Sequence, residues 1–182
     1  MQREFNYDPN PEKGLRANVP NTTEKREYKK LLVNIKNNMQ KDIQRQYGQT
    51  DKPVFITYQT GAQYMRDTLS ISMAQLEAAN EYDDIICAGP IYPMTDRGGH
   101  LDSNGYRWFG EMLGKVYYQS QVQGKPFQPL QPTVIARETL PTQIRIKCHV
   151  PVRPLVFDVN LVPKIKDYGF EIYLRDYRQE NK

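Results

Sequence analysis

Long hydrophobic runs are absent from this sequence. No apolar stretch approaches the roughly 18 residues that a membrane-spanning helix needs, and the mean hydropathy is −0.75. The first residues, MQREFNYDPNPEKG, contain no apolar core of the kind that signal peptides carry. The sequence therefore excludes a helical membrane protein. We expect a secreted, cell-surface or phage-particle location only if this chain belongs to a larger protein.

Cysteine and histidine are also scarce, with two of each. Cys87 and Cys148 lie too far apart for a metal-binding motif and are too few for a disulfide framework. We expect both to be buried thiols, and we expect neither a metal nor a cofactor. The 25 basic and 21 acidic residues give a net charge of +4. No segment is basic enough to indicate a nucleic-acid-binding surface.

The chain begins with an arm at residues 1–21, which is rich in Asn and Pro and has no periodicity. A helix is predicted next. It starts at Thr22 or Thr23, either of which could act as its N-cap, and it stops near Gly48. The buried stripe expected for this helix repeats at steps of three and four residues and consists of Tyr28, Leu31, Leu32, Ile35, Met39 and Ile43.

Two short apolar runs follow, each bounded by residues that break regular structure. Residues 52–59, KPVFITYQ, and the core IICA of residues 83–93 are predicted to be buried strands. Between them, residues 72–82 predict a short helix in which Ser72 and Gln75 have the spacing of a capping box. A further helix is expected from about residue 103 to residue 118.

The order helix, strand, helix, strand, helix indicates an α/β fold with a parallel sheet covered on both faces. Two strands alone would make a poor sheet of this kind, because each would keep an unpaired edge and three helices would have little sheet to cover. We therefore interpret residues 22–119 as the second half of a larger layered domain. The missing strands must come from elsewhere.

Beyond this region the pattern changes. Residues 120–132 are a Gln/Pro-rich linker that cannot continue a helix. Residues 133–182 contain short β-rich or alternating runs, divided by Pro and Gly, which predict a small antiparallel β module. Its expected strands are TQIRIKCHVPV, PLVFDVNLV and YGFEIYLRDY.

The loop after the second expected strand carries Asp96 and His100 in the run DRGGHLDSNGY. This loop follows the carboxyl end of the strand, the edge of an open α/β sheet where ligands tend to bind. In acyl transfer a histidine takes the nucleophile's proton, while an aspartate fixes the ring tautomer and stabilises the imidazolium. Gly98 and Gly99 would permit the sharp turn that brings such a pair together. A plainer interpretation makes His100 a structural loop residue and Asp96 a cap of the turn.

The runs KPVFITYQTG and SMAQLEAANEYDDIICAGPIYPMTDRGGHLDSNGYRWFGEML resemble the C-terminal half of the SGNH (GDSL-like) hydrolases, most closely the branch of sialate and other carbohydrate O-acetylesterases. The resemblance covers roughly residues 22–118 and implies part of a flavodoxin-like, three-layer parallel sheet. It implies that His100 is the catalytic base and Asp96 its carboxylate partner. The spacing Asp-Arg-Gly-Gly-His is one residue longer than the family's Asp-x-x-His. Asp102 is a second carboxylate in range, although we favour it as a helix-start residue.

The resemblance does not include the family's first half, where the nucleophilic serine stands in a Gly-Asp-Ser motif. That motif does not occur in this sequence. Its serines are Ser70, Ser72, Ser103 and Ser120, of which we expect Ser72 and Ser103 to cap helices. The expected function is the Asp/His half of a serine esterase that deacetylates carbohydrate, inactive alone and completed by a polypeptide that carries the serine. The alternative is a non-catalytic structural or interaction module of a larger surface or phage-particle assembly.

Overall fold

The computed structural model describes residues 25–60, 70–97, 100–137, 143–160 and 166–170. The chain divides into two compact units, Met1–Pro151 and Val152–Lys182. The elements of the first unit are α1 (Lys25–Tyr47), β1 (Phe55–Gln59), α2 (Ser70–Glu81), β2 (Ile85–Pro90), α3 (Ser103–Tyr117), the π-helical turn η3 (Tyr118–Val122), β3 (Gln131–Arg137) and β4 (Ile144–His149). The predicted arm, the cap at Thr22 or Thr23 and the Gly98–Gly99 turn lie outside the described residues.

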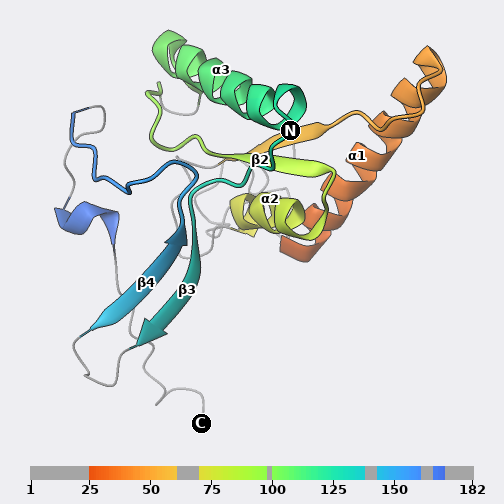
Figure 1. Ribbon diagram of the computed structural model, residues 1–182. Coiled ribbons are helices and arrows are strands. Elements are labelled where there is room, and N and C mark those ends of the chain that lie inside the picture. The colour runs from red at the N-terminus through yellow and green to blue at the C-terminus, as the bar shows by residue number, and fades with distance from the viewer. Residues whose placement is uncertain (1–24, 61–69, 98–99, 138–142, 161–165, 171–182) are drawn as a thin grey trace, which may run out of the picture. The chain divides into compact units, whose positions relative to one another are not determined.

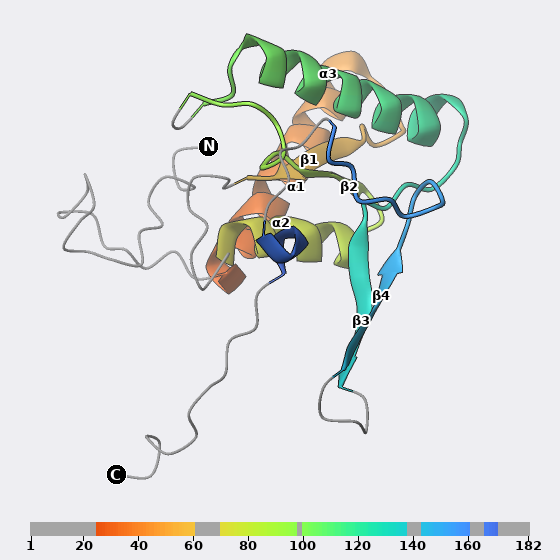
Figure 2. The same cartoon turned by 90° about the vertical axis from the view of Figure 1, so that its left-hand side faces the viewer.

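β1 and β2 form the parallel pair that the alternation of helices and strands predicts. Phe55 lies opposite Ile85, and Thr57 lies opposite Cys87. α3 lies on one face of this pair, whereas α1 and α2 lie on the other (Figures 1 and 2). The mixed α/β class is therefore confirmed. Among the described residues, the parallel sheet contains these two strands alone.

The core of the first unit lies where α1 and α2 meet the start of the sheet. Val33 of α1 packs with Ala78 of α2 and Ile85 of β2, and Leu32 and Phe55 pack against this cluster. Burial of these apolar side chains is the main force that holds the two helices on the sheet.

The stripe that α1 turns inward matches only part of the one that its apolar periodicity predicts, because Tyr28 is buried and Leu32 packs against the core. Ile35 and Met39 are 52% and 49% exposed, so the expected buried stripe was wrong at these positions. The buried residues of α1 include two long polar side chains and are Tyr28, Val33, Lys36 and Gln40.

The two polar side chains are buried because each has a specific partner. Lys36 Nζ lies 2.7 Å from both carboxylate oxygens of Asp84. Gln40 Nε2 donates to the Pro53 carbonyl at 2.8 Å. Burial by itself would raise the pKa of Asp84, but the hydrogen bonds and charge of Lys36 outweigh it and hold that pKa below its ordinary value. Polar pairing thus decides which side of α1 faces inward.

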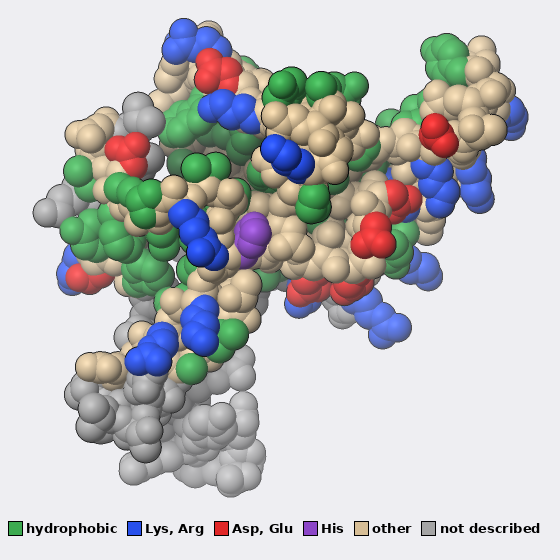
Figure 3. Space-filling model, viewed as in Figure 1, with side chains coloured by type: hydrophobic (Ala, Val, Ile, Leu, Met, Phe, Trp, Pro, Cys, Tyr) green, Lys and Arg blue, Asp and Glu red, His purple; other side chains and the backbone are tan. Residues whose placement is uncertain are grey.

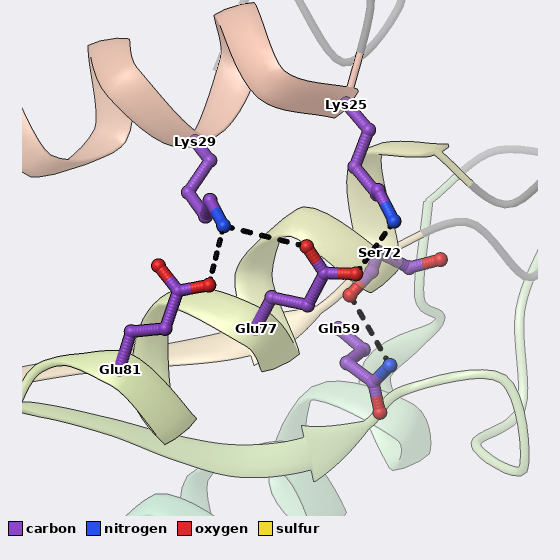
Figure 4. Close-up of polar contacts among 6 residues, drawn as sticks. All are labelled: Lys25, Lys29, Gln59, Ser72, Glu77 and Glu81. Atoms are coloured by element: carbon purple, nitrogen blue, oxygen red, sulfur yellow. Dashed lines mark hydrogen bonds and ion pairs between the residues drawn. The ribbon is translucent and has the colours of Figure 1, made fainter.

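Ion pairs join the facing sides of α1 and α2 near the surface (Figure 4). Lys25 Nζ lies 2.6 Å from Glu77 Oε1, and Lys29 Nζ lies 2.5 Å from Glu81 Oε1 and 3.5 Å from Glu77 Oε2. The hydrogen bond from Lys25 is the main cause that lowers the pKa of Glu77. Acidic and basic side chains accordingly gather together in the region of these two helices in the surface view (Figure 3).

The capping box predicted at Ser72 and Gln75 is wrong. α2 begins at Ser70, so Ser72 lies within its first turn. Gln75 is 2% exposed; its Oε1 accepts the Thr60 amide at 2.9 Å, and its Nε2 donates to the Tyr28 hydroxyl at 3.2 Å. The Gln75 side chain therefore bonds to distant residues and not to the start of its own helix. Gln75 links α1, α2 and the carboxyl end of β1.

An antiparallel hairpin of β3 and β4 follows η3, and Ile135 lies opposite Ile146 in it. The strand expected in TQIRIKCHVPV is confirmed as β4, whereas β3 was not predicted. Pro132 lies within β3, and the register shifts between Pro132 and Val134. Proline removes a ladder donor and weakens the sequence signal of a strand. β3 also starts within the predicted linker.

In its described residues, the second unit contains less regular structure than its composition predicts. Residues 154–160, most of the expected strand PLVFDVNLV, form no strand, so that prediction was wrong there. Instead the Phe157 ring lies 4.4 Å from the Tyr168 ring and 6.5 Å from the Phe170 ring, between centroids. Most of the third expected strand, YGFEIYLRDY, lies outside the described residues.

Candidate functional site

The Asp/His loop leaves the sheet where both parallel strands end. The Ile91 amide donates to the Gln59 carbonyl at 3.1 Å, which ties the two strand ends together. Met94 is 5% exposed, and its amide donates to the Ile91 carbonyl at 3.0 Å. A buried side chain and a turn therefore anchor the start of the loop at the carboxyl edge of the sheet.

Thr95 and Asp102 close the base of the loop, and we call this pair of residues the clasp. The Asp102 amide donates to the Thr95 carbonyl at 3.1 Å, and Thr95 Oγ1 donates to Asp102 Oδ1 at 2.6 Å. The same Oδ1 accepts the Gly105 amide at 2.8 Å, which makes Asp102 the N-cap of α3. A Cβ on Gly105 would lie 2.1 Å from the Thr95 oxygen. The clasp therefore joins the loop to the start of α3, and only glycine fits beneath it.

Above the clasp the chain forms a short antiparallel ribbon. Asp96 forms a β-bridge with Leu101, and the Arg97 amide donates to the His100 carbonyl at 2.9 Å. Asp96 and His100 consequently stand on adjacent rungs of one ribbon, and both side chains are exposed. The arrangement brings the backbones of a histidine and an aspartate close together at the sheet edge.

Asp102 has a structural role in this loop. Hydrogen bonds from the Thr95 hydroxyl and the Gly105 amide lower its pKa below the ordinary value. The carboxylate therefore stays ionised at neutral pH, and its Oδ1 is engaged by the clasp and the helix cap. The interpretation of Asp102 as a helix-start residue is confirmed. The expected cap at Ser103 was wrong, because Ser103 is the first residue of α3 itself.

The serines whose surroundings are described do not supply a nucleophile in a strand-to-helix turn. Ser72 is buried in α2. Ser103 begins α3, and Ser120 Oγ donates to the Val116 carbonyl at 2.8 Å at the end of that helix. The two thiols differ from each other. Cys87 is 1% exposed and burial raises its pKa to about 11, whereas Cys148 is only partly buried, which corrects one of the two expectations.

Sequence reasoning missed Thr95 and Gly105 as the residues that shape the loop. Thr95 has no local signal, because its partner Asp102 lies seven residues away and the pair is recognisable only once the chain has turned back. Gly105 does carry a signal. Glycine in the first turn of a helix lowers the stability of that helix. Its presence at such a position can therefore indicate that a neighbouring group comes too close for a Cβ.

Within the described ranges, no group of three His, Cys, Asp or Glu side chains is placed to hold a metal ion. None of the described helices is both long and apolar enough to cross a membrane. Comparison with known proteins gives no matching family model and no detectably similar curated protein or solved structure.

Proposed function

We propose that this chain is the base-bearing half of an SGNH-type serine esterase that removes acetyl groups from carbohydrate. In this proposal His100 is the general base, Asp96 is its carboxylate partner, and a separate or preceding polypeptide supplies the serine. The observation that carries the proposal is the clasped ribbon, which places Asp96 and His100 on adjacent rungs at the carboxyl edge of a parallel sheet. Ligands of open α/β sheets bind at this edge.

The two-stranded sheet also supports the proposal. Helices lie on both of its faces (Figure 1), and parallel sheets with this cover normally have more than two strands. We interpret the pair as part of a flavodoxin-like, three-layer sheet whose other strands belong to the serine-bearing polypeptide. In this proposal one missing polypeptide explains both why the sequence lacks Gly-Asp-Ser and why the described parallel sheet has two strands.

The chemistry assigned to each group follows from its place in the loop. His100 takes the proton from the serine hydroxyl as the oxygen attacks the acetyl carbonyl, and it returns that proton to the sugar oxygen as the ester bond breaks. Asp96 holds the ring tautomer and stabilises the imidazolium. Water then repeats the cycle on the acetyl-enzyme and releases acetate. The clasp fixes the ribbon against α3, which lowers the cost of positioning the base.

A second candidate function is a non-catalytic interaction module of a larger assembly. The observation that favours it is the number of exposed apolar side chains in the hairpin, where Ile135 is 68% exposed and Ile144 is 49% exposed. Contiguous exposed apolar surface commonly marks a contact with another protein. A measurement of ester hydrolysis distinguishes the two candidate functions, because an interaction module does not require His100.

The test is hydrolysis of p-nitrophenyl acetate and of an O-acetylated sugar. The chain alone should give no turnover above free imidazole, because a base without a nucleophile and oxyanion donors forfeits most of the rate gain. Addition of the polypeptide encoded immediately before this chain should produce turnover. His100→Ala should then lower kcat/KM by roughly 10²- to 10⁴-fold. His149→Ala, which alters the other histidine, is the matched control and should leave the rate unchanged.

A further inference from the structure

Three backbone pairings fix the register of the ribbon above the clasp. Residues that lie opposite each other in an antiparallel pair project from the same face, and successive residues along a strand alternate between the two faces. The register therefore tells which side chains of the ribbon share a face. The pairings join Thr95 to Asp102, Asp96 to Leu101, and Arg97 to His100.

This register places His100 and Asp102 on one face of the ribbon, because they are two residues apart on the same side of it. Thr95 Oγ1 reaches Asp102 Oδ1 at 2.6 Å, so the two side chains of that rung project from a single face. Arg97 lies opposite His100 and belongs to the same face. We call Thr95, Arg97, His100 and Asp102 the histidine face.

The residues of the remaining rung, Asp96 and Leu101, belong to the other face. A Cβ on Gly105 would lie 3.1 Å from Leu101 Cβ, so this second face is turned toward the start of α3. His100 is exposed on the opposite side. Asp96 would have to reach His100 around the edge of the ribbon, whereas Asp102 already stands on the face that His100 occupies.

Asp102 brings a fixed negative charge to the histidine face. The Thr95 hydroxyl and the Gly105 amide both donate to its Oδ1 and lower the pKa of the carboxyl group. The positive charge of Arg97 lowers this pKa further, which agrees with the shared face that the register gives to the two side chains. An anchored carboxylate loses little freedom when it acts on a neighbouring group.

Two opposite charges on the histidine face act on His100. Arg97 stands across the ribbon from it, and Asp102 stands two residues along the strand, roughly 6.6 Å away at the backbone. A nearby cation disfavours an imidazolium, and a nearby anion favours it. The first charged side chain of α3, Arg107, donates to Asn104 Oδ1 at 3.0 Å. Within the described ribbon, Asp102 is the acidic residue on the face of His100.

We propose that Asp102 also acts on His100, as a positioning residue whose negative charge stabilises the imidazolium that forms when His100 takes the serine proton. This inference rests on the proposed function and adds a second carboxylate to it. Asp102 gains no proton and forms no covalent bond in this step. The clasp and the helix cap hold it in place, so the same residue fixes the loop and serves the base.

The experiment uses this chain alone and follows the carbethoxylation of His100 by diethyl pyrocarbonate, which attacks the neutral imidazole. His149→Ala removes the other histidine of the chain, so the absorbance change reports on His100. At mildly acidic pH, Asp102→Asn should speed the reaction by about two- to threefold, because loss of the charge favours the neutral ring. At alkaline pH the two rates should agree, because the ring is then neutral with either residue.

Matched variants separate the charge of Asp102 from its structural role. Asparagine is as good an N-cap as aspartate and offers the same acceptor to Thr95, so Asp102→Asn should keep nearly the same midpoint of urea unfolding. Thr95→Val removes a bond of the clasp but keeps the charge. It should change the ratio of the acidic to the alkaline rate less than Asp102→Asn does. Asp96→Asn should also change this ratio less.

Other results would overturn the inference. A rate ratio that Asp102→Asn leaves unchanged, or that Asp96→Asn changes more, would show that Asp102 does not act on His100. In the completed pair, Asp102→Asn should lower kcat/KM by about threefold or more. A changed rate ratio with no hydrolysis by the pair would remove the proposed function and keep the effect of Asp102. Hydrolysis that requires His100, with an unchanged rate ratio, would do the reverse.

Discussion

The carbonyl oxygen of Thr95 lies directly over Gly105, where a Cβ would be only 2.1 Å away. Gly105→Ala should therefore open the clasp and destabilise the chain by about 1–3 kcal/mol, the usual cost of overpacking. Urea unfolding measures this loss. Gly110→Ala lies on the same helix with nothing within 4 Å of the added Cβ, and it should stabilise α3 by about 0.5–1 kcal/mol. Equal effects of the two substitutions would contradict the close approach.

Lys36 should contribute more to stability than any other lysine of α1. Its side chain is 4% exposed, whereas that of Asp84 is 29% exposed. Lys36→Met leaves the carboxylate without its cation, and we expect a loss of about 1–3 kcal/mol at neutral pH, below the figure for a fully buried pair because water reaches Asp84. Lys36→Met combined with Asp84→Asn should cost less than Lys36→Met alone. If the double variant is the less stable of the two, the pairing is not the cause.

The pH dependence of this effect follows from the lowered pKa of Asp84. A carboxylate with a depressed folded-state pKa stabilises the fold above its unfolded value, and the contribution is lost as the pH falls through the folded value. The difference in stability between the unsubstituted chain and Lys36→Met should therefore shrink as the pH is lowered past the ordinary Asp value of 3.8. Urea titrations at a series of pH values would detect this. A difference that stays constant would contradict the assignment.

The ion pairs between α1 and α2 should contribute less to stability than the pair of Lys36 and Asp84. Glu77 pairs with Lys25 and Lys29 at the surface, and Glu77→Gln should cost about 0.2–1 kcal/mol at neutral pH and low salt. Because the pKa of Glu77 is lowered, this contribution is lost as the pH falls below the ordinary value of 4.5. High salt should also reduce it. Thermal unfolding of the unsubstituted chain and of Glu77→Gln at two salt concentrations measures this contribution. A loss of stability that does not depend on salt would indicate that Glu77 acts through packing.

The two cysteines should differ in reactivity. Burial raises the pKa of Cys87 to about 11, so at mildly alkaline pH almost none of it is the reactive thiolate. Cys148 is partly exposed on β4. In the folded chain, 5,5′-dithiobis(2-nitrobenzoic acid) should titrate Cys148 quickly and Cys87 only as the protein unfolds. Rapid reaction of Cys87 in a Cys148→Ser variant would mean that the core around β2 is open.

The elements that sequence predicts well are those whose signal is local. Strands β1 and β2 are short apolar runs with clear boundaries, and Asp102 stands at the start of α3 with the side chain that an N-cap requires. The failures have distant causes. Gln75 binds Thr60 and Tyr28 instead of capping its own helix. Lys36 is buried because it pairs with Asp84, which lies 48 residues away in the turn between α2 and β2. Local periodicity contains no information on such partners.

The candidate site likewise contains one part that the sequence predicts and one part that it does not. The Asp/His loop could be found from residue types and from its place after a strand. The clasp could not, because Thr95 and Asp102 meet only when the loop has closed. Residues 98–99, which make the loop one residue longer than the family's pattern, lie outside the described residues.

We propose that His100 is the base of an esterase whose serine comes from another polypeptide. The most direct measurement is kcat/KM for p-nitrophenyl acetate of this chain combined with the polypeptide encoded before it, with and without His100→Ala. We predict hydrolysis by the pair only, and a loss of roughly 10²- to 10⁴-fold in the variant. Turnover by this chain alone, or an active pair that His100→Ala leaves unchanged, would contradict the role proposed for His100.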